Sequence, residues 1–324
     1  MVVLLTGVAG FIGSHVAEAL LARGDQVIGL DNLNDYYSVK LKRDRLARLQ
    51  GRNNFTFHKV DLARPDEVAE TLGATEFDGI IHLAAQAGVR YSLEAPMAYV
   101  NSNLIGHMTM MELARHHERC RHLVYASSSS VYGGNTELPF RESDRVDNPV
   151  SLYAATKKAD ELMSHAYAHT YGMAQTGLRF FTVYGPWGRP DMALWLFTEA
   201  ILAGRPIQVF NHGDMRRDFT YIDDIVNGVI RAYDRPPSAA EGLPHRIYNI
   251  GNHRSEPLLK LIEVLEQALG RKAERQFEPM QVGDVKETYA DLTAIERDLG
   301  YAPTTSIDVG VPRFVEWYRG YHGV

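Results

Sequence analysis

Short apolar runs alternate with longer amphipathic or polar stretches along this chain. Runs with the length and composition of buried parallel strands occupy residues 2–6, 26–30, 55–59, 79–83, 122–127, 174–181 and 246–250. Helical patterns lie between these runs. The first ends near residue 23, and others cover about 40–50, 96–116, 151–171 and 223–234, with C-terminal helices from 257, 293 and 309. This order predicts an α/β fold in which helices cover both faces of a doubly wound parallel sheet.

A glycine-rich turn follows the first predicted strand. It reads Gly7-Val-Ala-Gly10-Phe-Ile-Gly13, and the second strand ends at Asp31, 18 residues after Gly13. Such glycines permit a tight turn and let backbone N–H groups approach a pyrophosphate at a helix N-terminus. Asp31 can accept hydrogen bonds from ribose hydroxyls and repel a 2′-phosphate, which predicts NAD rather than NADP in a Rossmann fold. The spacing is G-x-x-G-x-x-G rather than G-x-G-x-x-G, and the alternative is a glycine turn without a ligand.

Two later strand ends carry side chains that suit the same cofactor. Asp61 and Leu62 follow the third strand, where Asp61 either binds the adenine amino group or caps a helix. Ala84 and Ala85 follow the fourth strand. Small residues at that position let the backbone lie close to a flat cofactor.

Polar side chains that suit proton transfer follow the fifth strand. The serines of 127–130 lie at the sheet edge where open α/β sheets bind ligands, although such a turn can also cap its own backbone. Tyr153 and Lys157 come next on a predicted helix, so their side chains leave the same face. Tyrosine is a weak base near neutral pH because its reference pKa is about 10, and a nearby ammonium favours the phenolate. The pair is either a tuned proton acceptor and donor or one packed and one solvated side chain of an amphipathic helix.

Composition excludes several other classes of protein. The 324 residues are 45% hydrophobic with a net charge of −6, and no basic patch with interleaved aromatics is present, so we expect no nucleic-acid partner. Cys120 is the single cysteine, which fits a reducing cytoplasm. No apolar run approaches the roughly 20 residues of a membrane span, and the run at 2–5 is too short for a signal peptide. We expect a cytoplasmic protein without a metal site.

The motifs occur together in a known family. TGVAGFIG, Asp31, the serine run and the Tyr153/Lys157 pair resemble the extended short-chain dehydrogenases/reductases, in the branch of the nucleotide-sugar epimerases and dehydratases. Tyr153 lies 25 residues after Ser128, and Ser128 stands three residues before Val131. Both relations match the Ser/Thr–Tyr–Lys triad of that family. The resemblance implies Ser128, Tyr153 and Lys157 as catalytic residues and NAD as the cofactor.

Three further stretches, at 88–94, 178–192 and 210–221, closely resemble UDP-glucuronate 4-epimerases. The cofactor residues that the motifs and the resemblance imply are Gly7, Gly10, Phe11, Ile12, Gly13, Asp31, Asn32, Asp61, Leu62, Leu83, Ala84, Ala85, Asn103, Tyr153, Lys157 and Phe180. The implied substrate residues are Arg90, Ser128, Ser129, Tyr153, Thr182, Arg189, Gln208, Phe210, Arg217 and Asp284.

The resemblance also assigns parts of a UDP-sugar to some of these residues. Arg217 would hold the diphosphate, Gln208 and Phe210 would lie at the uracil, and Asp284 would bind a ribose hydroxyl. The family commonly has an arginine three residues before that aspartate, and Gln281 stands there in this chain. The phosphates would therefore depend more on Arg217.

The implied reaction is epimerisation at C4 of the sugar. Tyr153, as phenolate, would take the proton of the C4 hydroxyl, Ser128 would hydrogen-bond the same oxygen, and Lys157 would hold the nicotinamide ribose. Hydride would pass from C4 to NAD and return to the other face of the 4-keto sugar. NAD would then be regenerated in each turnover.

A uronic acid substrate adds a hazard, because oxidation at C4 gives a β-keto acid that readily loses CO₂. Arg189 and Thr182, with Arg90 as a further possibility, are the candidates for holding the carboxylate. A 4,6-dehydratase carries an Asp-Glu pair where Ser129 and Ser130 stand, and a UDP-glucuronate decarboxylase commonly carries a glutamate in the serine run. We therefore favour an epimerase. The alternatives are the decarboxylase, a 4-epimerase of UDP-glucose or UDP-N-acetylglucosamine, and a non-catalytic NAD-binding sensor.

The same patterns suggest how the chain divides. We expect a Rossmann domain that binds NAD at 1–181, with segments returning at about 219–250, and a smaller, interleaved nucleotide-sugar-binding lobe at 182–218 and 251–324. The helices at 96–116 and 151–171 are candidates for the four-helix interface of a homodimer, as the family commonly uses.

Overall fold

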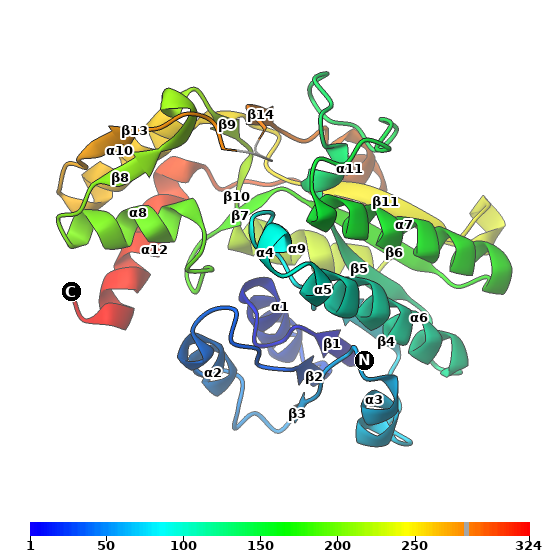
Figure 1. The fold of residues 1–324 in the computed structure, drawn as a ribbon. Helices are drawn as coiled ribbons and strands as arrows, with labels where there is room; N and C mark the ends of the chain where they lie inside the picture. Colours follow the sequence, from blue (N-terminus) through cyan, green and yellow to red (C-terminus); the bar gives the residue numbers. More distant parts are fainter. Residues whose placement is uncertain (282–284) are drawn as a thin grey trace.

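A seven-stranded parallel sheet forms the centre of the computed structural model, which describes residues 1–281 and 285–324 (Figure 1). The strand order is β11-β6-β5-β4-β1-β2-β3, so the chain starts inside the sheet, builds one edge and then crosses back to build the other. The strands are β1 Val2–Thr6, β2 Gln26–Asp31, β3 Phe55–Lys59, β4 Gly79–His82, β5 Leu123–Ser128, β6 Gln175–Phe180 and β11 His245–Ile250. The predicted doubly wound α/β fold is confirmed. The order reverses between β1 and β4, and ligands bind at such a point.

Helices cover both faces of this sheet. They are α1 Phe11–Ala22, α2 Val39–Ala47, α3 Pro65–Leu72, α4 Tyr91–Glu94, α5 Pro96–Tyr99, α6 Gly106–His116, α7 Leu152–Tyr171 and α9 Ile222–Tyr233. Strand β1 shows why its sequence is continuously apolar. Val3 and Leu5 belong to one core, whereas Leu4 joins Val68 of α3 and Met110 of α6 in a second core. A strand buried on both faces has no polar side to alternate with.

A smaller lobe lies beside the carboxyl ends of the strands (Figure 1). Its elements and the short segments near it are β7 Thr182–Tyr184, α8 Ala193–Leu202, β8 Ile207–Val209, β9 Arg216–Arg217, β10 Phe219–Tyr221, β12 Glu256–Pro257, α10 Leu258–Leu269, β13 Arg275–Phe277, β14 Glu287–Thr288, α11 Thr293–Leu299 and α12 Ile307–His322. Strand β13 pairs with β8, and β9 lies between β12 and β14. Trp195 packs edge-on against Tyr318 and at a tilt against Phe314 and Trp317, which gives the lobe an aromatic core.

The segment predicted as one helix at 96–116 is interrupted. A π-helical stretch, η1 Val100–Ile105, separates α5 from α6, and π-turns often occur at functional sites. The pattern also missed α3 and α8. Helix α3 begins with a proline, a start signal that was available in the sequence, whereas α8 has no side-chain cap.

The proposed boundaries of the two domains stay a prediction. Strand β7, which would begin the lobe, pairs in parallel with β10 of the returning segment 219–250. None of the helices in the described ranges is long and apolar enough to cross a bilayer.

Candidate active site

A cavity of about 740 Å³ lies where the carboxyl ends of the central strands face the lobe. Its lining contains every predicted cofactor residue except Asn103 and every predicted substrate residue except Asp284, which lies outside the described residues. The glycine turn and Tyr153 belong to the sheet side, and Gln208 and Arg217 belong to the lobe. Residues that are far apart in sequence therefore meet at one site, and the roles assigned to them stay predictions.

The glycine turn has the shape of a phosphate cradle. Gly7 has a φ of +71°, and a Cβ there would lie 2.8 Å from the backbone N of Ala84. A Cβ at Gly13 would lie 2.1 Å from the carbonyl oxygen of Gly7. Gly10 precedes α1 and offers no side-chain cap, and the first residues of that helix line the cavity. These N–H groups are suited to an anion, so the residues present fit the pyrophosphate of a dinucleotide.

Asp31 fixes the loop that follows β2. Its carboxylate accepts the backbone N–H of Ala9 at 3.1 Å and that of Leu33 at 2.8 Å. Burial raises the pKa of Asp31, and the N–H of Leu33 and the charge of Lys42 oppose that rise. Because a carboxylate oxygen has more than one lone pair, both oxygens can still accept ribose hydroxyls.

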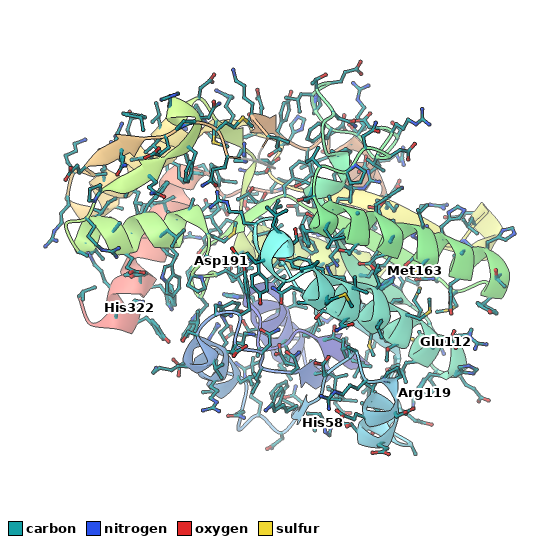
Figure 2. The ribbon with its side chains drawn as sticks, viewed as in Figure 1. His58, Glu112, Arg119, Met163, Asp191 and His322 are labelled. Carbon is teal, nitrogen blue, oxygen red and sulfur yellow. The ribbon has the colours of Figure 1, made fainter. Side chains whose placement is uncertain are left out.

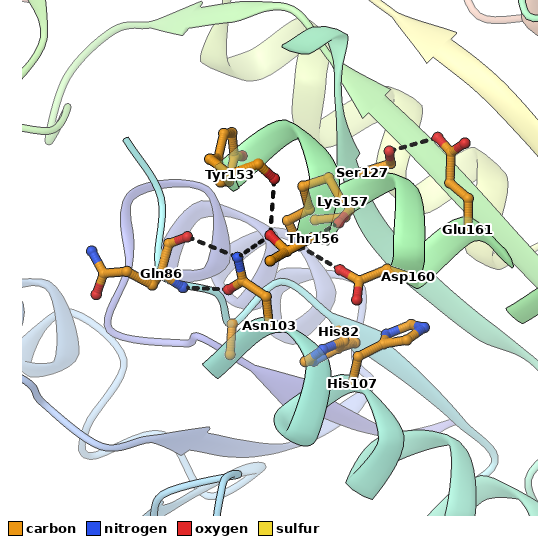
Figure 3. Close-up of polar contacts among 12 residues, drawn as sticks. His82, Gln86, Asn103, His107, Ser127, Tyr153, Thr156, Lys157, Asp160 and Glu161 are labelled. Carbon is orange, nitrogen blue, oxygen red and sulfur yellow. Dashed lines mark hydrogen bonds and ion pairs between the residues drawn. The ribbon is translucent and has the colours of Figure 1, made fainter. Parts of the chain in front are cut away.

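Of two other predicted cofactor residues, Asp61 lines the cavity and Asn103 does not. Asp61 accepts the N–H of Ala63 at 3.0 Å, but α3 begins at Pro65 after Arg64, so the alternative that Asp61 caps this helix is wrong. Asp61 lines the cavity. Asn103 is not among the lining residues, and its side chain bonds the backbone of Gln86 and the hydroxyl of Thr156 at 2.9 Å (Figure 3). Asn103 of the π-helical stretch therefore supports Gln86, which lines the cavity.

The four serines are not equivalent in the structure. Ser127 lines the cavity, but its hydroxyl is donated to Glu161 at 2.7 Å (Figure 3). Ser128 accepts the N–H of Ser130 at 3.2 Å, which leaves its own O–H able to donate. Ser129 and Ser130 begin a 3₁₀ turn and also line the cavity. This pattern favours Ser128 over Ser127 as the hydroxyl for a reacting oxygen.

Tyr153 and Lys157 are placed by the start of α7. The Ser151 side chain accepts the N–H of Ala154 at 3.1 Å and caps the helix just before Tyr153. The Tyr153 ring packs edge-on against Tyr99, with ring centres 6.0 Å apart. Both side chains of the pair line the cavity, as their spacing on one helix face predicted.

On the lobe side, aromatic and basic groups face the same cavity. The guanidinium of Arg90 lies over the ring of Phe210, 5.3 Å from its centre, which joins the segment after β4 to the lobe. Gln208 is exposed on β8. Arg217 donates to the carbonyl oxygen of Lys286 at 3.1 Å. These groups form a rim that suits a base and a diphosphate.

Arg189 is already paired with a carboxylate. Its Nε donates to Asp191 at 3.0 Å, its Nη2 contacts the other oxygen of Asp191, and Tyr36 donates to that carboxylate at 3.1 Å. Burial opposes charge on both partners, yet the pair raises the pKa of Arg189 and lowers that of Asp191. Figure 2 places Asp191 near α4, between the sheet and the lobe. The predicted carboxylate-binding group is therefore charged and held in place.

Sequence reasoning missed the residue that holds this loop. Arg45 of α2 is fully buried and donates to the carbonyl oxygens of Trp187 at 2.7 Å, Gly188 at 2.9 Å and Ala9 at 3.2 Å. It thereby ties the Arg189 loop to the glycine turn. Helix α2 reads as a charged surface helix, so no local signal marks this arginine.

A doubly wound parallel sheet with a glycine turn beside a Tyr–Lys pair defines a class, the NAD-dependent enzymes of the short-chain dehydrogenase/reductase type. More narrowly, the sequence model of the NAD dependent epimerase/dehydratase family matches residues 3–251, and the chain belongs to that family.

Curated relatives and solved structures agree with this assignment. Protein CapI of Staphylococcus aureus is 49% identical over 99% of both chains. A probable UDP-glucuronate 4-epimerase of Rhizobium meliloti is 49% identical over 97% of this chain and 96% of its own. The crystal structure of UDP-glucuronic acid 4-epimerase from Bacillus cereus, in complex with UDP-glucuronic acid and NAD, superimposes with a TM-score of 0.90 at 31% identity, covering 99% of this chain and all of the other.

Proposed function

We propose that this protein is a UDP-glucuronate 4-epimerase that interconverts UDP-glucuronate and UDP-galacturonate with NAD. One observation carries the proposal beyond the family. The same cavity holds the Ser128, Tyr153 and Lys157 set on the sheet side and the charged Arg189 at the opposite loop. A proton-transfer pair and a carboxylate-binding cation within one cavity fit a uronic acid better than a neutral sugar.

Each residue has a distinct task in this mechanism. The glycine turn and Asp31 would hold NAD, which would supply the hydride acceptor and donor for C4. Tyr153 removes the proton from the C4 hydroxyl and gives it back, while Ser128 donates a hydrogen bond to the same oxygen. Lys157 stabilises the phenolate and holds a ribose hydroxyl. Arg189 and Thr182 keep the C5 carboxylate from aligning its breaking bond with the ketone.

The serine run supports epimerisation over elimination or decarboxylation. Ser129 and Ser130 line the cavity where a dehydratase places its acid pair, and a hydroxyl has no pKa useful for that proton transfer. The carboxylates in the described lining are Asp31, Asp61 and Asp191, and the last is paired with Arg189.

Product analysis tests the proposal directly. Purified protein incubated with UDP-glucuronate should yield UDP-galacturonate, seen by NMR as inversion at C4 with the uronate retained. Release of CO₂ with a UDP-pentose would replace the proposal with decarboxylation. Turnover of UDP-glucose with none of UDP-glucuronate would assign a neutral sugar instead.

We further propose a homodimer formed through the helical segments at 96–116 and 151–171, which contain α5, α6 and α7. Exposed apolar side chains gather there, with Leu93 on α4, Met97 on α5, Ile105 on η1 and Leu162 on α7 exposed by 71%, 62%, 39% and 59%. Light scattering should give twice the mass of one chain, and Leu162→Glu should shift the protein to monomer. A wild-type protein that stays monomeric at high concentration would contradict the proposal.

A further inference from the structure

A buried ion pair lies directly behind the catalytic face of α7. Lys157 Nζ is 3.1 Å from Asp160 Oδ2, and the two side chains are only 3% and 1% exposed (Figure 3). The same ammonium donates to the carbonyl oxygen of Ala126 at 2.9 Å. One of its three N–H groups is therefore directed to the end of β5 and a second to Asp160 on α7, which leaves one for a cofactor hydroxyl.

The groups that face this pair from other elements are neutral. His82 lies at the end of β4 and His107 on α6, and their rings stack with centres 5.4 Å apart. Burial lowers the pKa of His82 to about 3 and that of His107 well below its usual value. Tyr125 faces the pair from β5, and burial raises its pKa well above the usual value. Neither histidine nor this tyrosine carries charge at neutral pH.

The neighbouring carboxylate on α7 has partners of its own. Glu161 accepts Nε of Arg179 at 2.8 Å and Nη2 at 2.9 Å, and Lys158 lies 3.4 Å away. Glu161 also accepts a hydrogen bond from the hydroxyl of Ser127. Asp160 is therefore the carboxylate that forms the ion pair with Lys157.

Among the described residues, Lys157 is the one hydrogen-bond and ion-pair partner of the Asp160 carboxylate. Its second oxygen, Oδ1, has no hydrogen-bond partner within residues 1–281 and 285–324. Burial raises the pKa of Asp160 to about 6, and the charge and hydrogen bond of Lys157 oppose a further rise. A buried carboxylate with one unsatisfied oxygen is costly, so its presence beside the catalytic lysine needs a function.

We propose that Asp160 is a positioning residue that holds Lys157 against the end of β5 and, through its negative charge, sets the pH range in which Tyr153 acts as the phenolate. This proposal rests on the proposed epimerase function and deepens it. A negative charge opposes ionisation of nearby acids, so Asp160 offsets part of the stabilisation that Lys157 gives the phenolate. Asp160 does not line the cavity, so it acts through Lys157 rather than on the substrate.

Asp160→Asn tests the charge while keeping the shape and an oxygen acceptor for Lys157. Removing a negative charge favours loss of a proton from every neighbour, so both limbs of the kcat–pH profile should move to lower pH by about one unit. The KM for the sugar nucleotide should stay near that of the wild type. Asp66→Asn on the exposed face of α3 removes the same charge far from the site and should leave both limbs in place.

A second measurement does not need turnover. Ultraviolet difference titration of NAD-loaded protein against Tyr153→Phe reports ionisation of that phenol alone, and Asp160→Asn should shift this titration in the same direction. Asp160→Ala should repeat the shift, and Asp160→Glu should restore the wild-type titration. Folded Asn and Ala variants with unchanged profiles and titrations would overturn the proposal. Absence of turnover on UDP-glucuronate in the wild type would instead refute the epimerase assignment, while the phenol titration still decides the role of Asp160.

Discussion

Tyr153→Phe is expected to reduce epimerase turnover on the order of 10³-fold while the protein keeps its fold and its NAD. The substitution removes only the phenolic oxygen. The ring still packs against Tyr99, and Lys157 keeps both of its protein partners. With no group to take the C4 proton, hydride removal would have to form an unstabilised protonated ketone. The measurement is kcat from NMR time courses, with NAD content determined from the absorbance of denatured protein.

The matched control lies on the same helix. Tyr171 ends α7 and is 49% exposed, so Tyr171→Phe makes the same chemical change away from the cavity and should leave kcat unchanged. Equal losses in both variants would point to damage to α7 rather than to chemistry. Near-normal turnover of Tyr153→Phe would remove Tyr153 from its assigned role.

The sequence predicted those parts of the site whose signal is local. The glycine turn needs a positive φ at Gly7 and the absence of a Cβ at Gly13, so the residue type itself reports the geometry. Tyr153 and Lys157 share a helix turn, and their spacing places them together. The apolar runs predicted the parallel sheet because strands buried on both faces tolerate few polar residues.

Contacts across long sequence separations were not predictable in the same way. Arg45 bonds the carbonyl oxygens of Trp187 and Gly188, and nothing near it in the sequence indicates that it is buried. Asp160 looks like a polar position of an amphipathic helix until the structure shows that its side chain is buried and paired with Lys157. The π-helical stretch at 100–105 has no marker in the pattern, because its unusual hydrogen bonding accompanies contacts between Asn103 and distant segments.

The second large effect concerns the carboxylate of the substrate. Arg189→Met should lower kcat/KM for UDP-glucuronate by roughly 100-fold, which corresponds to about 3 kcal/mol for a lost charge-assisted, bidentate contact. Methionine keeps much of the length of the side chain and removes the charge. Binding of UDP-glucose, measured as competitive inhibition, should change little because its CH₂OH group does not need a cation.

A matched control is available for this substitution as well. Arg205 is 60% exposed and pairs with Glu199 on the surface, so Arg205→Met removes the same group outside the cavity and should leave kcat/KM unchanged. Surface pairs of this kind contribute little to stability.

The products of the Arg189→Met variant distinguish two roles for the arginine. Asp191 occupies two N–H groups of Arg189, and a guanidinium has five, so substrate can be bound without breaking the internal pair. If Arg189 holds the uronate away from the geometry for CO₂ loss, the residual turnover of the variant should release CO₂ and a UDP-pentose in increased proportion. If Arg189 only attracts the substrate, turnover should fall with the product still fully epimerised. Equal losses for UDP-glucuronate and UDP-glucose would show that Arg189 supports the loop through Asp191 and Tyr36 instead.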